Sequence, residues 1–324
     1  MAISKTKYLA SNEEIISLFA RHGIEGITEI SPLGDGEFNA VYKVVAGENR
    51  YALKIAPPKD AKVLGYEQNM MHSEVYWYGQ IDQHTSIVTP KVIASDFTHQ
   101  DIASDCFIMT LLDAKPLYKF NFTEAERVNV QEQKIEMLTM IHKVKGEQFG
   151  YIQMGLHDSW YAAIRSMAEK LVKDCEELGK ETPDGHKFLQ FIDQHKAILE
   201  KVPCRMVNFD LWDSNVLCAD GKLCWIDPER SFYGDPIADF ITLGKGQKAP
   251  LTEKLEQIEI YNRTAAEPVS ASREECIRYA IAVCYLALIE EVEKYVRYEP
   301  DNPVYLRNTI DARDMYDMAF EVLK

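Results

Sequence analysis

The sequence predicts an α+β fold with two lobes, in which a small antiparallel sheet precedes a larger, mainly helical part. The chain of 324 residues is longer than one ordinary domain. Short strand-like segments fill much of residues 27–112, and helical periodicity dominates the rest. We therefore expect an N-terminal lobe over residues 1–112, a C-terminal lobe over residues 113–324, and a ligand cleft between them.

The N-terminal lobe is predicted to hold a helix, several short strands and a second helix. Ser11, with Glu14 three residues later, forms a capping box that begins the first helix, and Gly23 ends it. Gly47-Glu48-Asn49 is typical of a hairpin turn between two strands. The predicted strands are Ile27–Leu33, Ala40–Val45, Tyr51–Ile55, Lys91–Ala94 and Cys106–Leu112, and the second helix is Tyr66–Ile81.

The C-terminal lobe is predicted to be helical except for one stretch, Arg205–Asp235. Thr123 and Glu126 form a second capping box, which begins a helix that runs to about Val144. Within the non-helical stretch, two short strand-like runs are joined at Asp220-Gly221. The further predicted helices are Ser159–Leu178, His186–Leu199, Glu253–Tyr261 and Arg273–Tyr298.

Charge and composition restrict the partners of the chain. Acids outnumber bases 51 to 36, which gives a formal net charge of −15. This argues against nucleic acid or an anionic membrane as the main partner, because both need a basic surface. No apolar run approaches the roughly 18 residues of a membrane span, and the N-terminus does not resemble a signal peptide. The seven cysteines form no Cys-x-x-Cys pair, so we expect reduced thiols in a cytoplasmic protein.

The densest group of chemically active residues lies in the non-helical stretch. Asp210 and Asn215 are five residues apart in one loop, and Asp227 ends the next short strand. Two carboxylates and an amide oxygen are hard oxygen ligands that suit magnesium. A carboxylate left free of metal can orient and deprotonate a hydroxyl, and phosphoryl transfer needs both functions. Trp212 and Glu229 are possible residues of an acceptor pocket, and packing is an equal alternative for Trp212.

A Gly-rich turn lies between the first two predicted strands. It reads Gly34-Asp35-Gly36-Glu37-Phe38-Asn39, and a tight turn of this kind can bring backbone N–H groups against phosphate oxygens. An ordinary hairpin turn is the alternative. We therefore treat Gly34, Gly36 and Asn39 as candidate nucleotide-binding residues.

Lys54 lies in the third predicted strand among apolar residues. Its two neighbours point to the opposite face of the strand, so Lys54 can share a face with the Gly-rich turn. Glu74 follows twenty residues later on the next helix and is the expected ion-pair partner, with Glu67 as its rival on the same helix.

In this order, the motifs resemble those of the aminoglycoside phosphotransferase and choline kinase-like family, small-molecule kinases with a protein-kinase-like fold. The resemblance runs from about Leu33 to the C-terminus. It rests most on Asp210-Leu211-Trp212-x-x-Asn215, Ile226-Asp227-Pro228-Glu229 and Gly234-Asp235-Pro236-x-x-Asp239. It implies a bilobal kinase fold with ATP and Mg²⁺ as cofactors.

The resemblance also implies a role for individual residues. Apart from the resemblance, we expect Asp239 to support the catalytic loop and His142 to be a packed core histidine and not a ligand. The implied roles are Asp210 as catalytic base, Asn215 and Asp227 as magnesium ligands, Lys54 with Glu74 at the α- and β-phosphates, and the backbone from Thr110 to Leu112 at adenine.

Two departures from the family pattern stand out. The family usually has His-Gly-Asp where this chain has Asn208-Phe209-Asp210, and Phe209 lacks the backbone freedom of glycine. Asn39 replaces the last glycine of the protein-kinase loop, which favours a small-molecule kinase over a protein kinase.

The sequence therefore predicts an ATP- and Mg²⁺-dependent phosphotransferase that acts on a hydroxyl of a small molecule. An amino sugar, an amino alcohol or a related metabolite or antibiotic is the expected acceptor class. The alternatives are a catalytically silent, nucleotide-binding regulator, which the Asn208-Phe209 departure suggests, and a protein kinase. The oligomeric state stays open.

Overall fold

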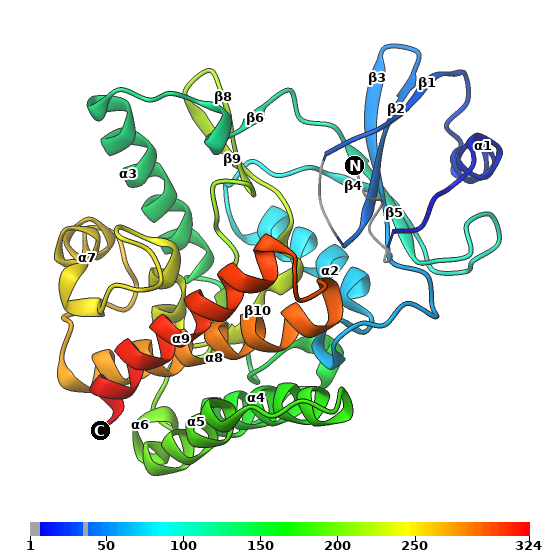
Figure 1. Cartoon of the computed structure of the whole chain (residues 1–324). Coiled ribbons are helices and arrows are strands. Elements are labelled where there is room, and N and C mark those ends of the chain that lie inside the picture. The colour runs from blue at the N-terminus through cyan, green and yellow to red at the C-terminus, as the bar shows by residue number, and fades with distance from the viewer. Residues whose placement is uncertain (1–6, 35–37) are drawn as a thin grey trace.

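A five-stranded antiparallel sheet forms the first part of the computed structural model, which describes residues 7–34 and 38–324. The strand order is β1-β2-β3-β5-β4, with β2 antiparallel to both β1 and β3, and a tight hairpin joins β2 to β3. Figure 1 shows the sheet at one side of the molecule and most of the helices at the other. The strands are β1 (Ile27–Pro32), β2 (Ala40–Ala46), β3 (Asn49–Ile55), β4 (Val92–Asp96) and β5 (Cys106–Thr110).

One helix packs on each face of this sheet. α1 (Asn12–Arg21) buries Ile15, Leu18 and Phe19 against one face. α2 (Met70–His84) covers the other face and also packs against a short 3₁₀ helix, Pro228–Arg230, of the helical part. α2 therefore connects the sheet to the rest of the molecule.

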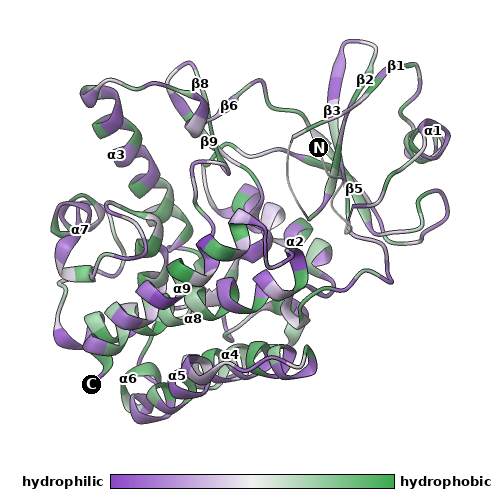
Figure 2. Cartoon of the chain, viewed as in Figure 1, coloured by the Kyte–Doolittle hydropathy of each residue, from purple (hydrophilic) through white to green (hydrophobic). Residues whose placement is uncertain are grey.

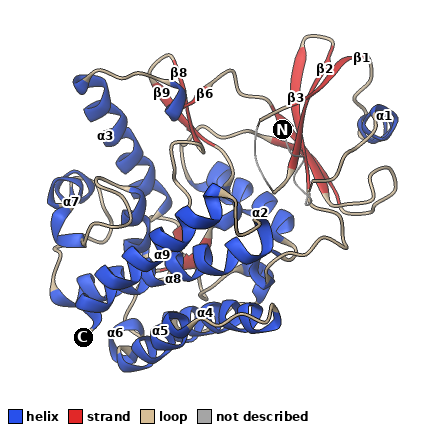
Figure 3. Cartoon of the chain, in the orientation of Figure 1, coloured by secondary structure: helices blue, strands red, loops and turns tan. Residues whose placement is uncertain are grey.

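The remaining chain is mainly helical and contains two small sheets (Figure 3). β6 pairs with β8 and β8 with β9, while β7 pairs with β10. The strands are β6 (Lys115–Pro116), β7 (Arg205–Val207), β8 (Val216–Ala219), β9 (Lys222–Trp225) and β10 (Phe232–Gly234). The helices are α3 (Glu124–Ile141), α4 (Trp160–Glu177), α5 (Pro183–Gln194), α6 (Lys196–Leu199), α7 (Leu255–Asn262), α8 (Arg273–Arg297) and α9 (Pro303–Leu323). Short 3₁₀ helices include η1 (Gly65–Glu67), η4 (Pro228–Arg230) and η5 (Pro236–Thr242).

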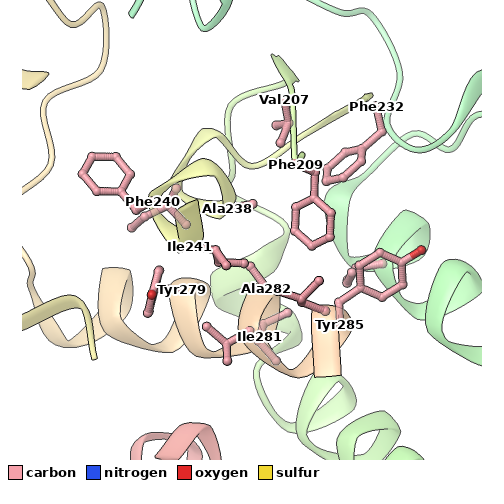
Figure 4. Close-up of a cluster of buried hydrophobic side chains, with 14 of the residues drawn as sticks. Val207, Phe209, Phe232, Ala238, Phe240, Ile241, Tyr279, Ile281, Ala282 and Tyr285 are labelled. Carbon is pink, nitrogen blue, oxygen red and sulfur yellow. The ribbon is translucent and has the colours of Figure 1, made fainter. Parts of the chain in front are cut away.

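α8 is the centre of the helical lobe. Every residue from Tyr279 to Ile289 is buried, because α9, α4, α5 and η5 surround the helix. Figure 4 shows its residues Ala282 and Tyr285 on the side of the helix that faces Phe209. Figure 2 shows the outer helices α3, α4 and α9 with mixed hydrophilic and hydrophobic residues, as expected of helices with one exposed face.

Most predicted elements are present. Both capping boxes form, at Ser11 and at Thr123, and the hairpin turn at Gly47 and the turn at Asp220-Gly221 join the strands expected. The fold class is the one predicted: a small antiparallel sheet followed by a larger helical part. The boundary at residue 112 stays a prediction.

Three helices differ from the prediction. The predicted helix His186–Leu199 is two helices, α5 and α6, which meet at His195. The second helix of the chain begins at Met70 and not at Tyr66, because Asn69 has left-handed backbone (φ 56°) and breaks the chain into η1 and α2. α9 was not predicted. Its start carried a signal, since Asn302 caps the helix and Pro303 occupies its first position.

No helix within residues 7–34 and 38–324 is long and apolar enough to cross a membrane.

Gly234 offers a test of the packing around β10. A Cβ added there would lie 2.6 Å from ring atoms of both Phe232 and Trp160, which are buried. We expect Gly234→Ala to lower the free energy of unfolding by about 1–3 kcal/mol, measured by urea denaturation. Gly79→Ala, in α2 where an added Cβ meets nothing within 4 Å, is the matched control and should raise it by roughly 0.5–1 kcal/mol. Equal effects at the two sites would contradict this packing.

Candidate active site

Lys54 of β3 lies at the centre of the candidate active site with three carboxylates around its ammonium group. Its Nζ lies 2.7 Å from Glu74 Oε2, 2.5 Å from Asp227 Oδ1 and 3.0 Å from Glu229 Oε2. Burial lowers the pKa of a lysine, but the carboxylates, Asp227 first, outweigh burial and raise the pKa of Lys54 well above its ordinary value. The lysine is therefore charged, and it joins both lobes.

The partner of Lys54 on α2 is Glu74, not its rival Glu67. Glu74 is only 1% exposed, and burial raises the pKa of its carboxyl well above the usual range despite the lysine. Its Oε1 has no hydrogen-bond partner in the described part of the chain. Glu67 accepts a hydrogen bond from the backbone N–H of Leu64 at 2.7 Å and pairs with Arg297.

Local geometry explains why these groups meet. Leu53 and Ile55 pack beneath α1, so alternation along β3 directs Lys54 to the opposite face. Asp227 has left-handed backbone (φ 63°), which few residue types other than Gly, Asn and Asp adopt. Its N–H donates to the Tyr78 hydroxyl at 3.0 Å, which ties the turn to α2.

The last residue of the Gly-rich turn, Asn39, contacts this cluster. Gly34 has φ 78°, the left-handed backbone that favours glycine. Gly36 lies outside the described residues. Asn39 is buried, and its Nδ2 donates to Glu229 Oε2 at 2.8 Å. Glu229 therefore lies on the nucleotide side of the predicted site, between Asn39 and Lys54.

The segment predicted to face adenine, Thr110 to Leu112, begins at the last residue of β5. The N–H of Thr110 donates to Lys91 O at 2.9 Å, and that of Leu111 donates to Arg50 O at 3.0 Å. The N–H of Leu112 makes no such bond to the described backbone. Leu112 is therefore the residue of this segment that keeps a backbone donor for a ligand.

Asp210 and Asn215 contact each other within the loop between β7 and β8. Asn215 Nδ2 donates to Asp210 Oδ2 at 2.8 Å and to its backbone oxygen at 3.0 Å. The backbone oxygen of Asn215 accepts from Ile226 N at 3.0 Å, which brings the loop beside Asp227. Burial raises the pKa of Asp210 to about 7, and the Arg230 guanidinium opposes this shift.

The sequence profile of the phosphotransferase enzyme family (APH) matches residues 29–271, about three quarters of the chain. The chain belongs to this family. It is therefore a small-molecule phosphotransferase, which confirms the family predicted from the motifs. Comparison with curated protein sequences finds no significant match.

Solved structures similar to this phosphotransferase share its fold over nearly their whole length. A Ralstonia eutropha JMP134 protein assigned as an aminoglycoside phosphotransferase has a TM-score of 0.68 at 16% identity, covering 97% of this chain and 98% of the other. A Haemophilus somnus 129PT protein assigned as a fructosamine-3-kinase has a TM-score of 0.67 at 15% identity, covering 94% and 96%. The streptomycin–ATP–APH(2")-IIa ternary complex gives 0.60 at 15%, covering 94% and 97%. These similarities confirm the bilobal kinase fold.

Asp239 of η5 holds the backbone at the start of the loop between β7 and β8. Its carboxylate accepts from the backbone N–H groups of Asn208 at 2.9 Å and Phe209 at 2.6 Å. His142 Nε2 contacts the same carboxylate at 2.9 Å, and its Nδ1 contacts the Tyr261 hydroxyl at 2.8 Å. Asp239 and His142 are fully buried, as expected of supporting residues.

A chain of charged side chains beside the site was missed by sequence reasoning. Arg230 Nη2 donates to Glu293 Oε1 at 2.9 Å, and Arg297 Nη1 lies 2.6 Å from the same oxygen. Arg297 also pairs with Glu67 and lies over the Phe38 ring, 5.1 Å from its centroid. The series links the catalytic segment to the Gly-rich turn. The position of Arg230, directly after Glu229, was the available signal.

The two residues predicted for an acceptor pocket lie in different surroundings. Trp212 is half-buried against the core of the helical lobe, whereas Glu229 contacts Lys54 and Asn39. A cavity of about 490 Å³ opens between the Gly-rich turn, the end of β3 and the start of α2, and Asn39 and Glu229 form part of its wall. The structure thus does not bring Trp212 and Glu229 together, and their roles at an acceptor stay predictions.

Glu290 of α8 gives a pH-dependent test. Its Oε2 is buried without a hydrogen-bond partner among the described residues, and burial, with Asp311 adding to it, raises the pKa of Glu290 to about 7. A carboxyl with a folded-state pKa above its unfolded value favours the folded state below about pH 4.5 and loses that contribution as pH rises through 7.

We therefore expect Glu290→Gln to leave unfolding free energy nearly unchanged at pH 4.5 and to raise it by about 1–2 kcal/mol at pH 8, measured by urea denaturation. Glu259→Gln, at an exposed position of α7, is the matched control and should show no such pH dependence. A gain of equal size at both pH values would be evidence against an ionisation effect at Glu290.

Proposed function

We propose that the chain is an ATP- and Mg²⁺-dependent kinase that transfers the γ-phosphoryl group to a hydroxyl of a small molecule. One observation carries the proposal. Lys54 of the sheet contacts Asp227 of the helical lobe, and the loop that follows β7 holds Asp210 and Asn215 beside Asp227. A phosphate-binding cation, oxygen donors for a metal and a candidate base thus lie in one site.

The nucleotide part of the proposal rests on the N-terminal lobe. Lys54 can bind phosphate oxygens, with Glu74 holding it in place, and Gly34 and Asn39 flank the turn above it. Leu112 keeps a backbone donor for adenine. The similar APH(2")-IIa structure contains ATP, which supports the same choice of nucleotide here.

The residues fit a magnesium ion. One carboxylate oxygen from each of Glu74, Asp227 and Glu229 lies within 4.8 Å of the others, and three carboxylates around one lysine leave an excess of negative charge. Asp227 and Asn215 would hold the ion, with Glu229 as a further oxygen donor beside them. Bound there, Mg²⁺ would neutralise charge on the phosphates.

Asp210 is the proposed base. Asn215 fixes its Oδ2 and its backbone oxygen, and no hydrogen bond to Oδ1 is formed by the described residues. Oδ1 can therefore accept the hydrogen bond of an acceptor hydroxyl, orient it and take its proton. A silent regulator would have no chemical need for this base together with Lys54, Asn215 and Asp227.

An amino sugar, an amino alcohol or a related molecule is the proposed acceptor class. The similar structures include proteins assigned as aminoglycoside and fructosamine kinases. Asp210 and Glu290 place carboxyl groups near the site, which is compatible with a cationic acceptor. A panel of amino sugars, amino alcohols and sugar thioethers, assayed for phosphate transfer from Mg·ATP, tests the proposal. Absence of transfer to every member would count against this acceptor class.

Asp210→Asn should lower kcat for the best acceptor by about 10²–10⁴-fold, because the amide cannot take the proton. Calorimetric nucleotide binding should stay near the unsubstituted value, since Asp210 does not touch Lys54. Asp213→Asn is the matched control. Asp213 lies three residues later in the same loop, and its exposed carboxylate pairs with Lys134. Full activity in Asp210→Asn would exclude Asp210 as the base.

Lys54→Met should raise the ATP concentration needed for half-maximal rate by roughly 10–100-fold, because a charge-assisted bond to phosphate is lost. The KM for the acceptor should change much less. Lys43→Met on β2 is the control, since Lys43 pairs with Glu29 at the surface. Unchanged nucleotide kinetics in Lys54→Met would refute the nucleotide site.

A further inference from the structure

We propose that Asn208 and Phe209, which stand where the family usually has His-Gly, are positioning residues that fix the backbone of Asp210 in its working geometry. The inference rests on the proposed function, because it assigns these two residues a task for the same base. It goes beyond that function by assigning the task to two side chains that depart from the family pattern.

The Asn208 side chain forms a local turn around Asp210. Its Oδ1 accepts a hydrogen bond from the backbone N–H of Asp210 at 2.8 Å. Asparagine forms such turns readily, because its side-chain oxygen mimics a backbone carbonyl and binds the N–H two residues later. The N–H of Asp210 is therefore held by the side chain of Asn208, while Asn215 holds its carbonyl oxygen and Oδ2.

Phe209 sets the backbone conformation that this turn needs. It has left-handed backbone (φ 62°), which is unfavourable for a residue with a Cβ. Its ring is buried, 5.3 Å from the Phe232 ring and 5.7 Å from the Tyr285 ring between centroids. Figure 4 shows the ring between Phe232 and the α8 residue Tyr285. Packing thus enforces a conformation that a glycine would merely permit.

Asp239 closes the arrangement from the other side. Its carboxylate accepts hydrogen bonds from the N–H groups of Asn208 and Phe209, and Asn208 Oδ1 accepts from that of Asp210. All three consecutive N–H groups from 208 to 210 therefore have side-chain oxygen partners. A loop held at each successive N–H has little freedom to move its side chains. Asp210 is therefore presented at a fixed place, with Oδ1 left for the acceptor.

An unpaired side-chain nitrogen of Asn208 allows a positioning role to be distinguished from a purely structural one. Asn208 is fully buried, and its Nδ2 has no hydrogen-bond partner among the residues described. Leucine has nearly the same shape, and it removes both the useful acceptor and this unpaired donor. Asn208→Leu should therefore keep the fold while it releases the N–H of Asp210.

The experiment compares Asn208→Leu and Asn208→Ser with the unsubstituted enzyme. We expect Asn208→Leu to lower kcat by about 10–100-fold, with KM for ATP within twofold and thermal midpoint within a few degrees. Serine can accept from the same N–H more weakly, so Asn208→Ser should recover much of kcat. Asn129→Leu, at an exposed position of α3, is the matched control. Unsubstituted kcat in Asn208→Leu, or no recovery in Asn208→Ser, would overturn the proposal.

Amide hydrogen exchange provides a readout that does not need activity. The N–H of Asp210 should exchange markedly faster in Asn208→Leu than in the unsubstituted chain, while amides of α8 stay protected. Unchanged exchange at Asp210 would refute the positioning role even if activity fell. Faster exchange in a chain that phosphorylates no acceptor would leave the positioning intact and refute the proposed function instead.

Phe209→Gly tests the second residue, because two explanations of Phe209 predict different results for this variant. If the ring enforces the loop, glycine should lower kcat and speed exchange at Asp210, although it relieves the unfavourable φ. If Phe209 is only tolerated strain, glycine should leave kcat and exchange unchanged. That second result would overturn the assignment of Phe209.

Discussion

Burial of one lysine among three carboxylates is the constraint on which the rest of the structure depends. Lys54 cannot neutralise Glu74, Asp227 and Glu229 together, and burial raises the pKa of Asp227 to about 6 as well as that of Glu74. Such a cluster is costly unless each partner is held in place, because a buried charge that loses its partner destabilises a protein by about 3–5 kcal/mol. β3, α2 and η4 supply these groups, so their packing is fixed by charge as well as by apolar contact.

A second set of buried charges also connects the two lobes. Arg297 pairs with Glu67 before α2 and with Glu293 on its own helix, and it lies over Phe38 of the Gly-rich turn. Arg230 extends the series to the catalytic segment. The two sets reach the Gly-rich turn from different directions, through Asn39 and through Phe38. Because both are largely buried, salt should screen them little, so the relative position of the lobes depends on side chains that surround the site itself.

The sequence predicted what local rules decide. Neighbouring residues are enough to predict the capping boxes at Ser11 and Thr123 and the hairpin at Gly47. They also predict the alternation along β3 that places Lys54 on the face opposite its apolar neighbours. The choice of Glu74 over Glu67 needed tertiary information, because Arg297, more than two hundred residues away, takes Glu67. The pairing of Arg230 with Glu293 was not predicted for the same reason. α9 was missed although Asn302 and Pro303 mark its start, since its apolar residues were not read as a helical pattern.

Phe209 shows why single-residue preferences fail where packing is strong. A left-handed residue with a Cβ costs roughly 1–2 kcal/mol, and the preference alone argues for a loop unlike that of the family. Full burial of a phenylalanine ring contributes about 1.5–3 kcal/mol, which is enough to offset that cost. The partners that bury the ring, Phe232 and Tyr285, come from β10 and α8, and neither was visible as a neighbour in the sequence. The Asn208-Phe209 departure suggested a catalytically silent protein, but it is compatible with a fixed loop. Packing of the Phe209 ring in the core stabilises the left-handed backbone that a glycine would adopt without strain.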